Sequence, residues 1–284
     1  MRDILARLRA TNRFSYVSFW ILVILYASAF LADLIAPYPY EMQNRDYPLC
    51  PPARLRFIDS RGQFHVRPFV YRMSLVNPSL NTYEVDTADR YPLSFFTRGP
   101  RRELFGCISS TRYLFSVRKP GNFFLLGTDN HGRDVFSRLL HGARVSLSIG
   151  LVGVGISFVL GLLIGGISGY AGGKTDTVLM RVVELFMLFP AFYLMLALRA
   201  AFPIHLSSLQ VYLLIVVILS LIGWASLARI IRGMVLSLKE EQYVLAARAL
   251  GLSTFRIITR HILPNTFSYT VTALTLSIPG YILG

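Results

Sequence analysis

The chain is dominated by apolar runs that are long enough to cross a lipid bilayer, a crossing that takes about 20 residues of helix. Because a backbone in lipid must satisfy its own hydrogen bonds, each run is predicted to be a helix. Four runs cover residues 16–37, 145–170, 178–198 and 209–227, and a fifth extends from about 267 to the last residue, 284. Only 15% of the residues are charged, against about a quarter in soluble domains. The sequence therefore predicts an all-α integral membrane protein with five spans.

The first 37 residues combine a basic segment with the first apolar run. Arg2, Arg7, Arg9 and Arg13 precede the run, and such cations favour the cytoplasmic side of a membrane. The tripeptide Ala-Ser-Ala at 27–29 resembles a signal-peptidase site, but the apolar stretch around it is longer than a signal core of roughly 7 to 15 residues. Residues 1–37 are therefore expected to be a cytoplasmic N-terminus followed by a retained transmembrane helix.

Residues 38–125 differ from the rest of the chain, because they are polar, aromatic and rich in proline, with short β-like runs such as 54–58. If the first run spans the membrane, this segment lies outside the cytoplasm, since the positive-inside rule tolerates basic residues in long translocated segments. We expect a small, irregular, β-rich extracytoplasmic insert. Cys50 and Cys107 both lie in it, in a compartment that permits disulfides. A bond between them is a hypothesis that requires their backbones to approach each other.

Counting spans from a cytoplasmic N-terminus places the turn at 172–176 inside, the turn at 200–207 outside and the segment 229–265 inside. That last segment contains six basic residues: Arg229, Arg232, Lys239, Arg248, Arg256 and Arg260. The span count and the positive-inside rule therefore agree.

The cytoplasmic segment has the pattern of two short helices. Glu240 and Glu241 stand where a helix dipole favours negative charge, and an alanine-rich run follows. Gly251 is predicted to end this helix in a left-handed cap conformation. Ser253 or Thr254 can cap a second helix, and Pro264 is expected to close the module. A helix pair with small residues on one face suits a groove on another protein, whereas the alternative is an amphipathic surface helix.

Glycines are frequent in the second apolar run, and Gly161 and Gly165 form a Gly-x-x-x-Gly pair. This spacing predicts close packing against another transmembrane helix. In the third run, Glu184 is an ionisable residue that could relay protons in a secondary transporter. Arg181 lies three residues earlier, so an ion pair within the helix is the competing interpretation.

Several other functions lack the residues they need. The net charge of +14 is scattered around apolar runs, which disfavours a nucleic-acid binder. The run Gly-Gly-Lys-Thr at 172–175 ends like a P-loop, but Ser168 occupies the position of the first glycine, and the run follows an apolar helix. The five histidines are dispersed, so no metal site is predicted.

Two motifs carry a family resemblance. Ala246-Ala247-x-x-x-Gly251, followed by Ile262-Leu263-Pro264, resembles the EAA loop in the permease subunits of bacterial ABC importers. The segment 126–147 begins Leu-Gly-Thr-Asp-Asn-His-Gly-Arg-Asp-Val and is similar to the signature before the second span of the C-type dipeptide and oligopeptide permeases. Its signature residues are Gly127, Thr128, Asp129, Gly132, Arg133, Asp134 and Arg138.

Shorter matches extend the resemblance over residues 126–284. They are Gly169-Tyr170-x-Gly172-Gly173 with Asp176, and Phe189-Pro190. The resemblance implies a type I ABC importer permease with a transmembrane core over 126–284 and a cytoplasmic coupling loop over 240–264. The residues implied to couple to the ATPases are Glu240, Glu241, Tyr243, Ala246, Ala247, Gly251, Ile262, Leu263 and Pro264.

The resemblance also implies the partners of such a permease. The chain would pair with a homologous permease in the lipid of the bacterial inner membrane, two cytoplasmic ATPase subunits would dock on it, and an extracytoplasmic binding protein would deliver di- or oligopeptides. ATP and Mg²⁺ would bind to the ATPases, so this chain is expected to carry no cofactor and no catalytic residue, and to bind no nucleic acid. Transport would proceed by alternating access.

Three features depart from the family pattern. Leu245 occupies the position of the glutamate that gives the EAA loop its name. The insert at 38–125 is longer than the usual loop and is similar to that of the microcin-related peptide permeases. The family has six spans and this chain ends within the fifth, so the sixth is expected to be missing. The alternatives are a proton-coupled secondary transporter, a membrane enzyme and a scaffold that does not transport.

Overall fold

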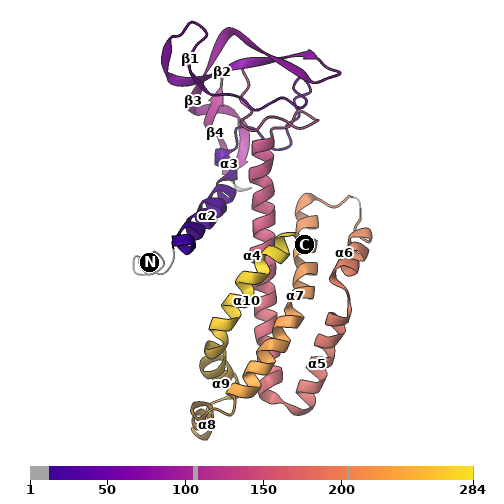
Figure 1. The fold of residues 1–284 in the computed structure, drawn as a ribbon. Helices are drawn as coiled ribbons and strands as arrows, with labels where there is room; N and C mark the ends of the chain where they lie inside the picture. Colours follow the sequence, from indigo (N-terminus) through magenta and orange to yellow (C-terminus); the bar gives the residue numbers. More distant parts are fainter. Residues whose placement is uncertain (1–12, 105–107, 204, 284) are drawn as a thin grey trace. The chain divides into compact units, whose positions relative to one another are not determined.

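The computed structural model describes residues 13–104, 108–203 and 205–283 and divides into two compact units, residues 1–145 and 146–284 (Figure 1). The first unit contains α2 (Arg13–Phe30), α3 (Ala32–Ile35), β1 (Arg56–Ile58), β2 (Phe64–Asn77), β3 (Thr82–Leu104), β4 (Ile108–Val117) and the start of α4 (Val135–Ala171). The second contains the rest of α4, then α5 (Gly173–Leu188), α6 (Ala191–Ala200), α7 (Ser208–Leu238), α8 (Gln242–Ala249), α9 (Thr254–Ile257), the π-helical turn η1 (Ile258–Ile262) and α10 (Leu263–Leu283).

The insert is an antiparallel sheet in which each strand pairs with the next along the chain, in the order β1-β2-β3-β4. The long strand β3 pairs with β2 from Asn77↔Thr82 to Phe69↔Pro92 and then with β4 from Leu93↔Val117 onward. Such local pairing needs only short turns. The prediction of a β-rich insert is therefore confirmed, and the register of each strand pair shifts at least once, which agrees with the expected irregularity.

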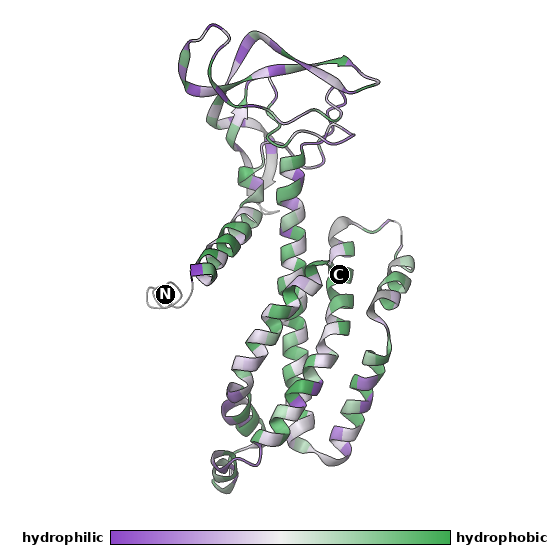
Figure 2. Cartoon of the chain, viewed as in Figure 1, coloured by the Kyte–Doolittle hydropathy of each residue, from purple (hydrophilic) through white to green (hydrophobic). Residues whose placement is uncertain are grey.

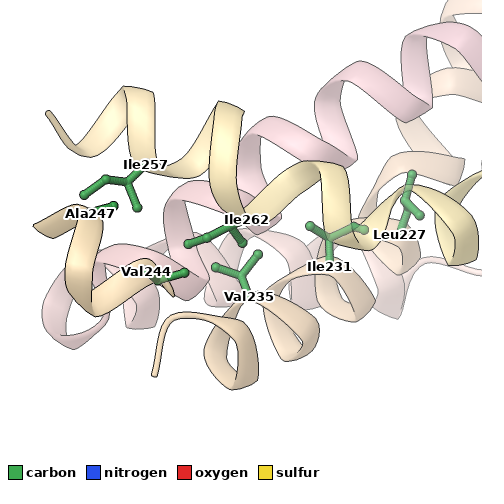
Figure 3. Close-up of a cluster of buried hydrophobic side chains, with 7 residues drawn as sticks. All are labelled: Leu227, Ile231, Val235, Val244, Ala247, Ile257 and Ile262. Carbon is green, nitrogen blue, oxygen red and sulfur yellow. The ribbon is translucent and has the colours of Figure 1, made fainter. Parts of the chain in front are cut away.

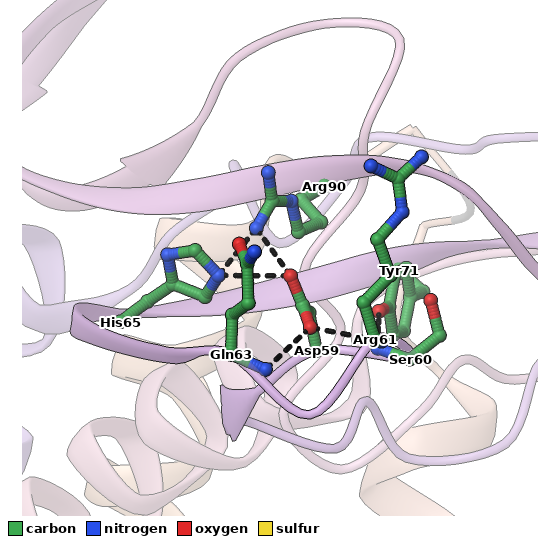
Figure 4. A network of polar contacts seen from close by, with 7 residues as sticks. All are labelled: Asp59, Ser60, Arg61, Gln63, His65, Tyr71 and Arg90. Carbon is green, nitrogen blue, oxygen red and sulfur yellow. Dashed lines mark hydrogen bonds and ion pairs between the residues drawn. The ribbon is translucent and has the colours of Figure 1, made fainter.

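A buried carboxylate organises the turn between β1 and β2 (Figure 4). Asp59 Oδ1 accepts hydrogen bonds from the backbone N–H groups of Arg61 and Gln63, both at 2.9 Å. Its Oδ2 lies 3.0 Å from His65 Nε2 and 2.7 Å from a terminal guanidinium nitrogen of Arg90. The hydrogen bond from His65, with those from the backbone and the charge of Arg90, lowers the pKa of Asp59 to about 2. A polar network thus fixes this end of the sheet.

Cys50 carries a free thiol in the structure, and the hypothesis of a disulfide with Cys107 stays a prediction. Cys107 lies outside the described residues. Cys50 is buried in an apolar cluster with Tyr47 and Phe124, and burial raises the pKa of its thiol to about 11. A thiol that stays protonated is a poor nucleophile, so the environment of Cys50 suits packing better than disulfide exchange.

Within the part of the chain that the structure describes, three helices are long and apolar enough to cross a membrane: Arg13–Phe30, Val135–Ala171 and Gln210–Leu238. They correspond to the first, second and fourth predicted spans, and hydrophobic residues run along all three (Figure 2). The third predicted span is divided into α5 and α6, because Phe189 is extended and Pro190 interrupts the helix. The fifth corresponds to α10, which contains Pro279 and several hydroxyl residues. The number of spans stays a prediction.

Close packing of α4 against α7 is made possible by glycine. A Cβ placed on Gly165 would lie 2.5 Å from the carbonyl oxygen of Ala228, and one on Gly161 would lie 2.8 Å from the side chain of Leu227. Side chains larger than hydrogen would hold the two helices apart. On another side of α7, Trp224 packs with Val183 of α5. The second unit is therefore built around α7.

Candidate functional site

The segment 240–264 begins where α7 ends. The backbone N–H of the α7 C-cap, Lys239, donates to Val235 O at 2.9 Å, and α8 begins after its N-cap residue, Glu241. The carbonyl oxygen of Glu241 accepts from the N–H groups of Val244 and Leu245 at 2.9 and 3.0 Å, while its carboxylate makes no capping hydrogen bond. The two glutamates therefore favour the start of α8 through the helix dipole alone.

Gly251 ends α8 in a left-handed conformation with φ of 74°, as the sequence predicted. The N–H of Gly251 donates to Arg248 O at 3.0 Å, and the N–H of Leu252 donates to Ala247 O at 3.2 Å. These two bonds define a Schellman motif, which turns the chain sharply after the helix. A Cβ on Gly251 would meet no atom within 4 Å, so the demand for glycine comes from φ and not from crowding within the chain.

One face of the segment packs onto α7 (Figure 3). Val244 and Ala247 of α8 are buried, as are Ile257 and Ile262 after the turn. The complete buried cluster is Leu227, Ile231, Val235, Val244, Ala247, Ile257 and Ile262. α8 and the turn after it therefore share one apolar core with α7.

The opposite face of the segment exposes large apolar side chains. Leu250 is 80% exposed and Phe255 is 72% exposed, and Tyr243 and Leu245 are also exposed. Ala246 and Arg248 of α8 are exposed as well. An apolar surface with small residues between its large ones is typical of a docking site for another protein. The buried cluster and this surface together make the segment more than an isolated amphipathic helix.

Two polar contacts fix α8 further. The side-chain amide of Asn265 donates to Tyr243 Oη at 3.2 Å and to His261 O at 2.7 Å. The guanidinium of Arg248 lies over the ring of Tyr170, 5.4 Å from its centre. Tyr243 therefore ties α8 to the beginning of α10, and Arg248 ties it to the end of α4.

The end of the segment differs from the prediction. Pro264 was expected to close the module, but it is exposed at the second position of α10, directly after the π-helical turn. Proline is tolerated in the first turn of a helix, where its missing N–H costs no internal bond. Leu263 packs against the buried cluster. The segment therefore continues into α10 without a break.

An ion pair that sequence reasoning missed locks α7 to its neighbours. Arg232 Nε and a terminal guanidinium nitrogen each lie 2.5 Å from a carboxylate oxygen of Asp176, at the start of α5. Ser168 of α4 donates its hydroxyl to the same carboxylate. The bidentate pairing gives a fixed geometry, one turn from Val235 of the buried cluster. Both residues stand out in the sequence as charges beside apolar runs. No local sequence pattern, however, predicts a contact between positions that are 56 residues apart.

The signature residues 127–138 form a separate arrangement in the first unit. The N–H of Thr128 donates to Cys50 O at 3.0 Å, and its hydroxyl accepts from the N–H of Cys50 at 2.8 Å. Asp129 accepts from the N–H and the side chain of Arg133 and from the side chain of Arg138. Desolvation raises the pKa of Asp129, but the hydrogen bonds from Arg133 and from the N–H of His131 outweigh it and lower the pKa to about 2.

Asp134 caps the beginning of α4. Its Oδ2 accepts from the N–H of Ser137 at 2.8 Å and from the Ser137 hydroxyl at 2.6 Å. About two and three turns after Asp134, His141 and Arg144 contact the carboxylate of Asp33 at 3.1 and 2.9 Å. The signature therefore leads into α4, whose first turns contact α3, and Gly127 and Gly132 adopt positive φ within the signature.

Glu184 pairs with Arg181 at 2.9 Å, and both side chains are exposed. The contact agrees with the ion-pair interpretation of this residue. Among residues 13–104, 108–203 and 205–283, no group of three His, Cys, Asp or Glu side chains could hold a metal ion.

Comparison with known proteins gives two family matches. Residues 161–284 match the inner membrane component of binding-protein-dependent transport systems, and residues 1–52 match the N-terminal transmembrane domain of oligopeptide transport permease C. The first match contains the whole segment 240–264, and neither covers residues 53–160.

Individual relatives give the same picture. A dipeptide transport system permease of Bacillus subtilis is 40% identical over 156 residues, which are 55% of this chain and 47% of that protein. An oligopeptide transport system permease of the same organism is 35% identical over 60% of this chain and 54% of its own length. A peptidoglycan transport system permease of Agrobacterium fabrum is 28% identical over 95% of this chain and 73% of its length. The chain thus spans about half the length of the first two, while the third alignment extends over the insert.

Proposed function

The chain belongs to the family of inner membrane components of binding-protein-dependent transport systems, and we propose that it is the permease subunit of an ATP-driven importer of di- or oligopeptides. Its task is to move peptides across the bacterial inner membrane by alternating access, and it makes or breaks no bond in the substrate. The observation that carries the proposal is the segment 240–264, which is anchored to α7 on one face and exposes an apolar surface on the other.

The geometry supports a coupling mechanism in three steps. An ATPase subunit binds the exposed surface around Leu250 and Phe255, and its closure on ATP moves α8. The shared core of α8 and α7 transmits the movement. The contact between Asp176 and Arg232 then carries it to α5, so that the helices move together and the bundle opens to the other side.

The partners follow from this mechanism. Two cytoplasmic ATPase subunits hydrolyse ATP, a homologous permease completes the translocation path, and an extracytoplasmic binding protein delivers the peptide. The named relatives are transport permeases for dipeptides, oligopeptides and peptidoglycan, which supports a peptide-like substrate. In this proposal the N-terminus and residues 240–264 are cytoplasmic, and residues 38–125 lie outside.

The orientation can be tested by labelling single cysteines in a cysteine-free background with an impermeant maleimide on intact cells. We expect a cysteine at Ser74, which is exposed on β2, to react, and one at Ser253, beside α9, to stay unmodified until the cells are permeabilised. The reverse pattern would invert the topology and exclude the cytoplasmic coupling surface.

The coupling assignment can be tested with Gly251→Asp in the assembled transporter. A side chain at this left-handed position costs about 1 to 2 kcal/mol, and its bulk and charge obstruct the ATPase surface. We expect the variant to insert and pair with its partner permease, but to lose most ATP-driven peptide uptake and ATPase binding.

A matched control separates docking from backbone strain. Gly62 has φ of 78° and open space around it, so Gly62→Asp introduces the same strain within the insert. We expect this variant to transport at the wild-type rate. Wild-type uptake and ATPase stimulation by the Gly251→Asp complex would overturn the assignment.

A further inference from the structure

A pocket of about 410 Å³ lies in the first unit, between the segment that follows α3 and the paired strands β3 and β4. Pro37 and Tyr38 line it on one side, and Arg98 and Tyr113 line it on the other. Its size is typical of a site for a small ligand or headgroup. It shares no residue with the segment 240–264 or with the signature 127–138.

The lining of the pocket is cationic. It includes Arg98, Arg118 and Lys119, and the described lining residues include no Asp or Glu. None of the three cations makes an ion pair within the described part of the chain, and all three are exposed. Asn122 and the hydroxyls of Ser94, Thr97 and Ser116 add hydrogen-bonding groups. Unpaired cations beside several donors select an anion such as a phosphate.

The distance from α2 indicates where this anion comes from. At 1.5 Å per residue, the 18 residues of α2 extend over about 27 Å, close to the hydrocarbon thickness of a bilayer. The pocket begins at Pro37, seven positions after α2 ends at Phe30. A site so soon after a transmembrane helix lies in the headgroup layer, and Tyr38 and Tyr113 are residues that such a layer favours.

We propose that this pocket binds the phosphate headgroup of an anionic phospholipid, with the acyl chains lying along the exposed apolar surface of α2. The inference rests on the proposed function only in assigning the site to the outer leaflet. The carboxylate of a soluble peptide is also an anion. The position of the pocket at the headgroup layer, however, favours a ligand that is already in the membrane. Bound lipid would then hold the insert against the bilayer surface.

The test uses the assembled transporter in nanodiscs of phosphatidylcholine with increasing phosphatidylglycerol, and native mass spectrometry counts the lipid retained. The variant Arg98→Gln/Arg118→Gln/Lys119→Gln removes the three cations. Each basic residue near an anionic surface contributes about fivefold to binding, so we expect affinity for phosphatidylglycerol to fall about a hundredfold. The control Arg45→Gln/Arg61→Gln/Arg67→Gln makes the same charge change on the insert outside the pocket and should retain wild-type affinity.

Each outcome decides between sources of the anion. An equal loss of affinity for phosphatidylglycerol in the two triple variants would overturn the site. Retention of phosphatidylcholine equal to that of phosphatidylglycerol would also overturn it. Displacement of the lipid by inorganic phosphate at millimolar concentration, or by a free peptide, would assign the pocket to a soluble anion and overturn the lipid. Maleimide labelling of the Ser74 cysteine on intact cells reports the leaflet independently, because Ser74 is exposed and lies outside the pocket. Labelling from the cytoplasm with lipid affinity intact would overturn the proposed topology and keep the site.

Discussion

Glycine serves different purposes in the two units of the chain. In the first unit, Gly132 has φ of 71°, and a Cβ there would lie 1.8 Å from the carbonyl oxygen of Asn44. In the second unit, Gly165 lies within the long helix α4, and its missing side chain allows α4 to approach the backbone of α7. Glycine thus shapes a loop in one unit and sets the separation of two helices in the other.

The stabilising contacts differ in the same way. The insert is held by paired strands, small aromatic clusters and carboxylates such as Asp59 that collect several hydrogen bonds. The second unit is held by a continuous apolar cluster around α7 and by the ion pair between Asp176 and Arg232. A change in the insert is therefore expected to act locally, whereas a change along α7 affects both the packing of the helices and the packing of the segment 240–264.

The largest effect is expected for Gly132→Ala. The substitution combines a left-handed conformation, which costs about 1 to 2 kcal/mol, with a backbone clash that costs about 1 to 3 kcal/mol more. The control Gly62→Ala has a similar φ and nothing within 4 Å, so only the first cost applies. The stability of both variants is measured by unfolding the purified protein in detergent, with the protease resistance of residues 38–125 as the readout. An equal loss of stability in the two variants would show that crowding by Asn44 contributes nothing.

A smaller effect is expected for Gly165→Ala in α4. The new methyl group must move the backbone at Ala228, which costs about 2 kcal/mol. Gly155→Ala lies on the same helix with no atom within 4 Å, and it should be neutral or stabilising by up to about 1 kcal/mol through helix propensity. Thermal unfolding followed by helical circular dichroism in detergent compares the two. If Gly155→Ala destabilised as much as Gly165→Ala, the close approach of α4 and α7 would not be the cause.

The parts that the sequence predicted well depend on neighbouring residues. The cap at Gly251 follows directly from an alanine-rich helix ending in glycine, and the helices α4 and α7 follow from uninterrupted apolar runs. The parts that the sequence did not predict depend on partners that are distant along the chain, or on a single residue that breaks a helix within an apolar run. Asp176 meets Arg232 only after three helices pack together, and Pro190 divides a run that is apolar apart from Arg181 and Glu184.

The smallest effect concerns the insert and depends on pH. Asp59 has a folded pKa of about 2, below the ordinary value of about 3.9 for an aspartate. A carboxyl group whose folded pKa is depressed stabilises the fold above its unfolded pKa and loses that contribution as the pH falls through the folded value. The insert should therefore lose stability between about pH 4 and pH 2, and Asp59→Asn should lower its stability at pH 6 and flatten this dependence.

Asp89→Asn, at an exposed carboxyl group on β3, is the control and should leave the dependence of stability on pH unchanged. Thermal unfolding from pH 2 to pH 6 measures all three proteins, and a wild-type profile in Asp59→Asn would show that the contacts with His65 and Arg90 do not stabilise the insert.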